Sequence, residues 1–413
     1  MAAAGKRNRI MNRSRVLRTV WRTPLLSRVE IAGRLGLDKS TVSSLVNELI
    51  DQKMIHEVAE GDASKQGGRR PVLLRINPAY GLVLGFEFQP DFYRAVLCDL
   101  DGRIERRWTE DVRREGRPFD EYVFDILNNV LVAMEDRRES LLAIGIAMGG
   151  LINSISNRIY GSIPMKLDEE YDFQTHIASR LDVPVVVEND ANACAWGELT
   201  FHRRHDFRDF LYVLVQIRQS EQGRRLYGGI GVGIGVVING TLYPGSHFTA
   251  GEFRSVFWND DGVGQFSLSD EEAERVSTDA AMRKRFFREL ARNIALIINV
   301  LDLDHLFIGG DCLVFRDEMD SIFHEEIQRN WPYDAAVNRT VSFSTLGEDA
   351  AAYGAAGLML DRLFSDQIFP LGDIRNRHGL DDLISTLSDA MVLRGSASEE
   401  PIGKNTTVPV EEP

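Results

Sequence analysis

The chain has 413 residues, of which 44% are hydrophobic and 27% charged, and its formal net charge is −14. These values are ordinary for a water-soluble globular protein of about two to four domains. No apolar run reaches membrane-spanning length and the N-terminus lacks a signal-peptide core, so we expect a cytoplasmic protein without a membrane partner. The three cysteines are far apart and form no CxxC, which excludes a disulfide framework and a cysteine metal site.

The N-terminal part of the chain has a helical pattern. Residues 1–11 are basic and expected to be mobile, and Asn12–Arg22 predicts a first helix. Within Ser27–Met54, apolar residues recur at helical spacing in two short runs, which predicts two helices with a sharp turn at Gly36. Asp38 lies where the second helix needs its N-cap. The inward-facing residues are Val29, Ile31, Ala32 and Leu35 in the first helix and Val42, Leu45, Val46 and Leu49 in the second.

The second of these helices has a polar face of short side chains with a basic residue at its start. The face consists of Lys39, Ser40, Thr41, Ser43, Ser44 and Asn47. Hydroxyl, amide and ammonium groups of this kind suit base edges and phosphates in the major groove of DNA. A helical hairpin on the surface of an enzyme would give a similar pattern, so the motif needs support from its surroundings.

A β-hairpin with a basic tip follows the two helices. Met54–Val58 and Pro71–Ile76 are β-prone, and the polar loop between them carries Lys65, Arg69 and Arg70. Residues 1–78 hold 15 Lys and Arg against 7 Asp and Glu, in an otherwise acidic chain. A basic head on an acidic body indicates a winged helix–turn–helix that binds double-stranded DNA, with Arg69 and Arg70 on the phosphate backbone. The alternative is a solvated basic terminus without a partner.

The remainder alternates strands and helices, which predicts an α/β body with a mostly parallel sheet in its first lobe. We place the first lobe at residues 79–200, the second at 201–394 and a disordered tail at 395–413. The expected strands are Leu82–Phe88, Tyr93–Leu100, Leu141–Met148, Val183–Val187, Phe210–Ile217, Ile230–Ile238 and Leu306–Ile308. The expected helices are Phe119–Met134, Phe173–Leu181, Ala191–Leu199, Met282–Leu303, Asp349–Leu363 and Leu380–Leu393.

The order of motifs resembles the ROK family of repressors and sugar kinases. The motifs are GGRRPVLLRIN in the head, then MGG (Met148–Gly150), VENDANACAWGE (Val187–Glu198), GGIGVGIGVVINGTLYPG (Gly228–Gly245), AGE (Ala250–Glu252), FIGG (Phe307–Gly310) and LGEDAAAYGAA (Leu346–Ala356). The resemblance extends from about residue 12 to about residue 390. It implies an N-terminal winged helix–turn–helix and a two-lobed actin-like ATPase or sugar-kinase body of ribonuclease H-like fold, with a sugar cleft between the lobes.

The resemblance also implies sugar-binding residues, namely Gly149, Gly150, Asn189, Asp190 and Glu252. Asn189 and Asp190 follow a buried strand, and α/β sheets place ligands at such strand ends. Each residue also has a purely structural alternative. Asn189 or Asp190 could cap a helix, the glycines could form a plain turn, and Glu252 could make a surface salt bridge.

The sequence departs from the family pattern in three places. GFEFQPD (Gly85–Asp91) replaces a glycine-rich phosphate loop, and the sequence shows no clear cationic partner for Glu87, so we expect no ATP binding, no catalytic residue and no cofactor. The positions of the family's zinc ligands are occupied by Ser255, Gln265, Ser267 and Glu272, so we expect no metal and some other brace for this loop. The third departure is an insertion, Arg218–Tyr227, which could be an interface loop, a lid or merely a tolerated insertion.

These observations lead to the hypothesis of a DNA-binding repressor of carbohydrate metabolism that lacks kinase activity. We expect a homodimer or a dimer of dimers on a palindromic operator, with a small carbohydrate as effector between the lobes. Two alternatives remain open. One is an active sugar kinase with a DNA-binding head, and the other is a regulator that has lost sugar sensing and responds to a protein partner.

Overall fold

The computed structural model describes residues 2–60, 70–114, 116–202, 207–217, 229–259, 264–336 and 338–364. Several predicted features lie outside these ranges: Lys65 and Arg69 of the hairpin tip, the insertion 218–227, the helix Leu380–Leu393 and the tail 395–413. Among the described helices, none is long and apolar enough to span a membrane.

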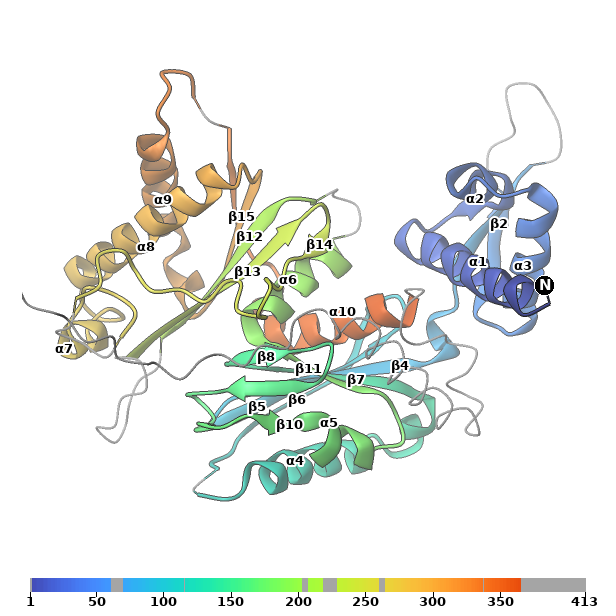
Figure 1. The fold of residues 1–413 in the computed structure, drawn as a ribbon, viewed down its shortest axis with the longest axis horizontal. Coiled ribbons are helices and arrows are strands. Elements are labelled where there is room, and N and C mark those ends of the chain that lie inside the picture. Colours follow the sequence, from blue (N-terminus) through green and yellow to red (C-terminus); the bar gives the residue numbers. More distant parts are fainter. Residues whose placement is uncertain are drawn as a thin grey trace, which may run out of the picture.

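The head is a winged helix–turn–helix (Figure 1). Its elements are α1 (Ala2–Arg22), β1 (Leu26–Ser27), α2 (Arg28–Leu35), α3 (Lys39–Asp51), β2 (Ile55–Glu60) and β3 (Val72–Ile76). The three strands form an antiparallel sheet in the order β1-β3-β2. Gly36 ends α2 in the left-handed conformation, at φ 62°, as the turn between the two helices requires.

Two predictions for the head were wrong. Residues 2–11, which were expected to be mobile and not helical, belong to α1, which begins at Ala2 and runs without interruption to Arg22. Alanines favour the helix at its start, and Arg9 and Arg13 further along bond to Glu48 on α3. Val29 does not point inward but is 57% exposed, because α2 is only two turns long and buries only Ile31 and Ala32 fully.

The first lobe is built on a five-stranded sheet in the order β11-β7-β4-β5-β6. Its strands are β4 (Leu82–Phe88), β5 (Phe92–Asp99), β6 (Ile104–Asp111), β7 (Leu141–Met148) and β11 (Val185–Asn189). Strands β11, β7 and β4 are parallel, whereas β5 and β6 are antiparallel to their neighbours. The sheet is therefore mixed and not mostly parallel, since the short connections between β4, β5 and β6 permit only antiparallel pairing.

Helix α4 (Phe119–Ala133) contributes apolar residues to the core on one face of this sheet, and a small sheet of β8 (Leu151–Asn153), β9 (Arg158–Gly161) and β10 (Tyr171–Asp172) adjoins it. The predicted helix Phe173–Leu181 is interrupted. It consists of α5 (Phe173–His176) and a 3₁₀ turn over Ala178–Arg180, because Ile177 leaves helical geometry at φ −124° and is fully buried.

The second lobe contains a sheet in the order β14-β13-β12-β15-β16. Its strands are β12 (Phe210–Ile217), β13 (Ile230–Ile238), β14 (Thr241–Leu242), β15 (His305–Gly310) and β16 (Thr340–Phe343). Its helices are α7 (Asp270–Glu274), α8 (Ala280–Val300) and α9 (Arg316–Asn330). Strand β12 is antiparallel to β13 and parallel to β15.

Two helices connect the lobes. Helix α6 (Asp190–Phe201) follows β11 of the first lobe, yet it contacts β12 and β13 of the second. Helix α10 (Ala350–Phe364) follows the second lobe, yet it lies across the first-lobe sheet (Figure 1). The packing is so close that a Cβ atom at Gly354 would lie 1.8 Å from the Ala193 carbonyl oxygen of α6. Small residues in α10 are therefore a requirement of this crossing.

The head is docked on the last turn of α10. The Trp21 ring of α1 stacks on Phe364 with centroids 4.7 Å apart, and its indole N–H donates to the Leu100 carbonyl. Asp361, only 8% exposed, accepts from Arg18 at 3.3 Å and from Arg22 at 3.0 Å. Apolar residues of the head and of α10 thereby share one continuous core.

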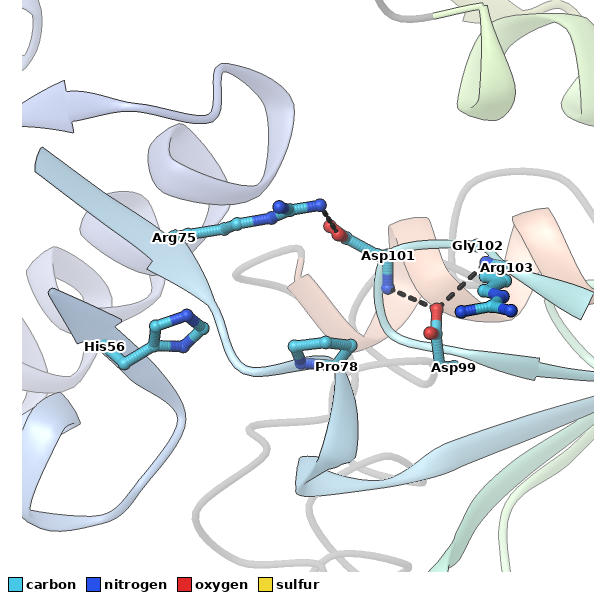
Figure 2. Close-up of a pocket in the computed structure, with 7 residues that line it drawn as sticks. All are labelled: His56, Arg75, Pro78, Asp99, Asp101, Gly102 and Arg103. Atoms are coloured by element: carbon cyan, nitrogen blue, oxygen red, sulfur yellow. Dashed lines mark hydrogen bonds and ion pairs between the residues drawn. The ribbon is translucent and has the colours of Figure 1, made fainter. Parts of the chain in front are cut away.

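A second contact joins the wing to the body. Figure 2 shows Arg75 of β3 paired with Asp101 in the turn between β5 and β6. Asp99 organises that turn by accepting from the backbone N–H groups of Asp101 and Arg103, both at 2.9 Å. A polar cavity of about 490 Å³ lies between these residues and His56 of β2. The head therefore rests on the body through an apolar contact and an ionic one.

Candidate functional site

The polar face predicted for α3 is open to solvent. Lys39, Ser40, Thr41, Ser44 and Asn47 are exposed and Ser43 is partly buried. The opposite face of α3 buries its four apolar residues in the core of the head, as predicted. The structure thus separates the polar and apolar faces in the way a recognition helix requires.

The residues around this face contribute arginines. Arg28 donates to the Asn47 side-chain oxygen at 3.1 Å and pairs with Glu57 at 2.9 Å. Arg70 is exposed two residues before β3, at the base of the predicted wing tip. Arg69 lies outside the described residues. The sequence pattern missed Arg28, which only the packing of α2 against α3 brings to the polar face.

Four of the five residues implied for sugar binding meet at the ends of two neighbouring parallel strands. Asn189 on β11 pairs in register with Met148 on β7, directly before Gly149 and Gly150. The Asn189 amide donates to the Gly150 carbonyl at 3.1 Å, and its oxygen caps α6 by accepting from the N–H groups of Ala191 and Asn192. Asn189 is therefore the helix cap, which is one of the structural alternatives considered above.

Asp190 lies where the two lobes touch. It is 6% exposed, and Gln216 at the end of β12 donates to its carboxylate at 3.4 Å. A Cβ atom at Gly149 of the first lobe would lie 3.5 Å from one Asp190 oxygen, and one at Gly233 of the second lobe 3.9 Å from the other. Gln216 was missed from the sequence, although it is the first polar residue at the end of an otherwise apolar strand.

Glu252 approaches the same point from a loop of the second lobe. The preceding Gly251 has φ 92°, and a Cβ atom there would lie 1.7 Å from the Ile234 carbonyl oxygen, so the loop can press on β13 only with glycine. The Glu252 residue as a whole is exposed, but neighbouring protein atoms desolvate its carboxyl group. This desolvation, with a smaller effect from the Asp190 charge, raises the pKa of Glu252 to about 6.

Glu87, at the end of β4, is the third carboxylate of this region. It is 4% exposed, and burial raises its pKa to about 7, with Asp190 adding to the shift. The expectation that Glu87 lacks a cationic partner was wrong. Arg94 lies directly opposite it on β5, with Nη1 3.4 Å from the carboxylate, because the antiparallel register pairs the two positions.

The turn after Glu87 has little to offer a phosphate group. The Gln89 N–H is bonded to the Phe92 carbonyl at 3.0 Å, and Pro90 has no N–H. The Gln89 side chain donates to Glu87 at 3.1 Å. A phosphate-binding loop needs backbone N–H groups directed at its ligand, and these two positions provide none.

The last turn of α10 connects this region to the head. Glu188 is 3% exposed and accepts from the Asn189 N–H at 2.9 Å. Arg362 on α10 donates to the Ser154 carbonyl at 3.1 Å and lies within electrostatic reach of Glu188. Arg362 is adjacent in sequence to Asp361, which holds Arg18 and Arg22 of the head. One turn of α10 thus contacts both the segment that follows β8 and helix α1.

Comparison with known proteins agrees with both parts of the structure. Residues 12–55 match the winged helix-turn-helix DNA-binding family, and residues 91–264 match the ROK family. The chain carries a ROK family domain behind a winged helix–turn–helix. This confirms the fold class and the family resemblance derived from the motifs.

Several xylose repressors are similar in sequence. The chain is 31% identical over 245 residues to the xylose repressor of Bacillus subtilis (strain 168), a match that covers 59% of each protein. It is 29% identical over 344 residues to the xylose repressor of Lactiplantibacillus pentosus, covering 76% of this chain and 83% of that one. The chain therefore spans about three fifths of the length of the first of these relatives.

Solved structures share the fold. The crystal structure of a ROK family transcriptional regulator, a homolog of the E. coli MLC protein, has a TM-score of 0.67 at 18% identity and covers 87% of this chain and 97% of that one. A ROK family glucokinase from Streptomyces griseus has a TM-score of 0.51 at 21% identity, covering 67% of this chain and 99% of that one. The second match shows that the body shares its architecture with kinases.

Hydrogen bonds hold the loop that corresponds, by the resemblance, to the zinc-binding loop of the ROK family. The Ser255 hydroxyl accepts from Asn293 at 3.1 Å, and Ser267 donates to Glu289 through both its N–H and its hydroxyl. The Gln265 side chain accepts from the Val232 N–H at 2.7 Å and donates to the Val232 and Phe253 carbonyls at 2.8 and 2.7 Å. Glu272 caps α7 and pairs with Arg285. Within the described residues, no group of three or more potential ligands could hold a metal.

This network predicts that stability depends on Gln265 and not on zinc. Gln265→Ala would leave three backbone partners of Val232 and Phe253 unpaired, at about 1 kcal/mol each, or about 3 kcal/mol in total. We expect the urea unfolding midpoint to fall accordingly, while a chelator leaves the wild-type midpoint unchanged. Gln52→Ala, at an exposed site, is the matched control. A midpoint that falls with chelator, or that is insensitive to Gln265→Ala, would contradict this account.

The buried Glu87 predicts a specific pH dependence of stability. Its pKa is raised from 4.5 to about 7, so the folded state holds the proton more tightly than the unfolded state. Its contribution is complete below about pH 4.5 and is lost as the pH rises toward 7, by about 3 kcal/mol. Wild-type stability should therefore decline between about pH 5 and pH 8 relative to Glu87→Gln in urea unfolding.

Glu348→Gln is the control for this measurement, because Glu348 pairs with the same Arg94 while its side chain is 88% exposed. The pH profile of Glu87→Gln is therefore read against this variant, which changes the ion pairs of the same arginine without removing a buried carboxyl group. If Glu87→Gln and wild type followed parallel pH profiles, Glu87 would not titrate in this range.

Proposed function

We propose that this protein is a sequence-specific DNA-binding repressor of carbohydrate metabolism whose DNA affinity depends on a small carbohydrate. The observation that carries the proposal is the exposed polar face of α3, in a head that is docked on a ROK body. A recognition helix packed inward against the body would have excluded it. The names of the similar repressors add support.

In this proposal the α3 face enters the major groove. Asn47 suits adenine, which an amide can bond at two points, and Lys39 with the hydroxyls of Ser40, Thr41, Ser43 and Ser44 suits other base edges and phosphates. Arg69 and Arg70 lie along the phosphate backbone and contribute affinity without sequence preference. We place the DNA-binding domain at residues 1–78, the lobes at 79–200 and 201–394, and a tail at 395–413.

The effector site that we propose is at the junction of the lobes, around Asp190 and Glu252 with Gly149, Gly150 and Asn189. Carboxylates accept strong hydrogen bonds from sugar hydroxyls, and both lobes contribute groups next to Asp190. A ligand held from both sides would favour one lobe arrangement over another. Because several similar proteins are named xylose repressors, D-xylose is the first effector to test.

The contacts of α10 support a physical route from this site to DNA. Arg362 and Asp361 are neighbours, and one contacts the segment around Ser154 and Glu188 while the other holds Arg18 and Arg22 of the head. A shift of the lobes that moves α10 would therefore move α1. In a homodimer or a dimer of dimers on a palindromic operator, this changes the spacing of the two heads. We place the protein in the cytoplasm, where such an operator is accessible.

The phosphate-binding function of kinases is the part that we propose has been lost. The turn at Gln89 and Pro90 directs no backbone N–H of those residues outward, and the Glu87 carboxylate occupies the adjacent position. An ATP phosphate placed there would meet a buried acid and few donors. The carboxylates of the junction then serve as hydroxyl acceptors and not as catalytic bases.

DNA binding and its control by sugar can be measured by fluorescence anisotropy. The wild type should prefer a duplex from the promoter of its own gene over a scrambled duplex of equal length by about 1,000-fold or more. Asn47→Ala should reduce that preference, Arg70→Ala should weaken binding to both duplexes equally, and D-xylose or another monosaccharide should release the promoter duplex. No preference for the promoter duplex at any salt concentration would refute the repressor.

Kinase activity can be tested with a coupled ATP-consumption assay. We expect D-xylose and D-glucose to produce no turnover above that of Asp190→Asn, because Gln89 and Pro90 offer no backbone N–H to a phosphate group. Thermal-shift measurements on the same samples would show whether the sugars bind at all. Sugar-dependent ATP consumption that disappears in Asp190→Asn would establish an active kinase instead.

A further inference from the structure

Helix α1 carries an arginine that reaches the polar face of α3. The Arg9 Nη2 group lies 2.9 Å from a Glu48 carboxylate oxygen and 3.4 Å from the Ser44 hydroxyl. Ser44 belongs to the face proposed to enter the major groove, and Glu48 follows it by one helical turn. The part of α1 that the sequence pattern did not predict thus extends the DNA-facing surface.

Glu48 would be unfavourable at this position if it were alone. A carboxylate one turn from Ser44 faces the same side as the phosphates of a bound duplex and would repel them. Each of its oxygens, however, is paired with an arginine of α1, Oε2 with Arg9 at 2.9 Å and Oε1 with Arg13 at 3.2 Å. Two guanidinium groups against one carboxylate leave a local excess of one positive charge.

The two arginines differ in exposure. The Arg13 side chain is 16% exposed and Glu48 is 28% exposed, whereas the Arg9 side chain is 57% exposed. Toward the described residues, Arg9 donates both of these hydrogen bonds from the single nitrogen Nη2. A guanidinium has five N–H donors, and the 57% exposure of this side chain leaves it accessible to a group outside the protein. Arg13 mainly neutralises Glu48, and Arg9 provides the outward-facing charge.

We propose that Arg9 is an additional DNA-binding residue that bonds a backbone phosphate beside the groove occupied by α3, held in position by Glu48. The ligand is the phosphodiester of duplex DNA, contacted without reading the base sequence. This inference rests on the proposed DNA-binding function and extends its surface from α3 and the wing to α1. An ordinary surface ion pair is the simpler account, and it would contribute at most about 1 kcal/mol to stability and nothing to DNA affinity.

The two accounts predict different effects for two variants. If Arg9 binds phosphate, Arg9→Gln should weaken binding to promoter and scrambled duplexes alike by about five- to tenfold and lower the slope of log K against log salt concentration by about 1. Glu48→Gln should strengthen binding to both duplexes several-fold, because it removes the repulsive charge. A purely structural ion pair would leave both quantities unchanged.

The measurement is an anisotropy titration of the full chain with both duplexes over a series of KCl concentrations. The matched control is Arg316→Gln, whose side chain is 70% exposed on the second lobe. Unfolding midpoints for every variant verify that the head is intact. Arg9→Gln indistinguishable from Arg316→Gln would overturn this inference and leave the repressor standing, whereas a wild type that binds neither duplex would overturn both.

Discussion

The close packing of α10 on the first-lobe sheet is the constraint on which the other features of the molecule depend. A Cβ atom at Gly85 of β4 would lie 2.0 Å from the Ala352 carbonyl oxygen, and one at Gly145 of β7 would lie 2.1 Å from that of Ala355. Such contacts leave no room for sliding, because interiors are packed to crystal density and rearrange between discrete arrangements. Helix α10 therefore moves with the first-lobe sheet as one body.

The end of this rigid helix is where the head is attached. Trp21 and Phe364 supply the apolar part of the contact, and Asp361 supplies the ionic part. Separating a largely buried carboxylate from its cationic partners leaves an uncompensated charge. The bonds of this contact are therefore expected to form and break together. A head attached in this manner moves with the first lobe. Its orientation relative to the second lobe therefore depends on the angle between the two lobes.

Two regions of the body have side chains other than those that a zinc site or a phosphate site would need. Gln265 fixes its loop through three hydrogen bonds to backbone groups, and Ser255 and Ser267 bond to polar groups of α8. At the junction of the lobes, Glu87 and Glu252 have raised pKa values because they are desolvated near Asp190. A cluster of this kind disfavours further negative charge and is compatible with a neutral polyhydroxyl ligand.

Much of this structure was predictable from the sequence, because its strongest signals are local. The apolar runs of β4, β7, β12 and β13 gave the observed bounds, since strands buried on both faces read as continuous hydrophobic segments. Weaker signals were missed: β6 is an edge strand with charged side chains, and α9 is mostly polar. The helix–turn–helix was found from its turn at Gly36 and from its two apolar faces.

The contacts that join these segments in space are not local. Gln216 reaches Asp190 from the other lobe, Arg9 reaches Glu48 across 39 positions and Arg22 reaches Asp361 across 339. No periodicity or motif encodes such pairs, because they depend on how complete elements pack. The sequence by itself determined the fold class, the ROK family domain and the polar face of α3. Only the tertiary structure decided how the head is held on the body and which charges surround Asp190, since burial and distance set these electrostatic effects.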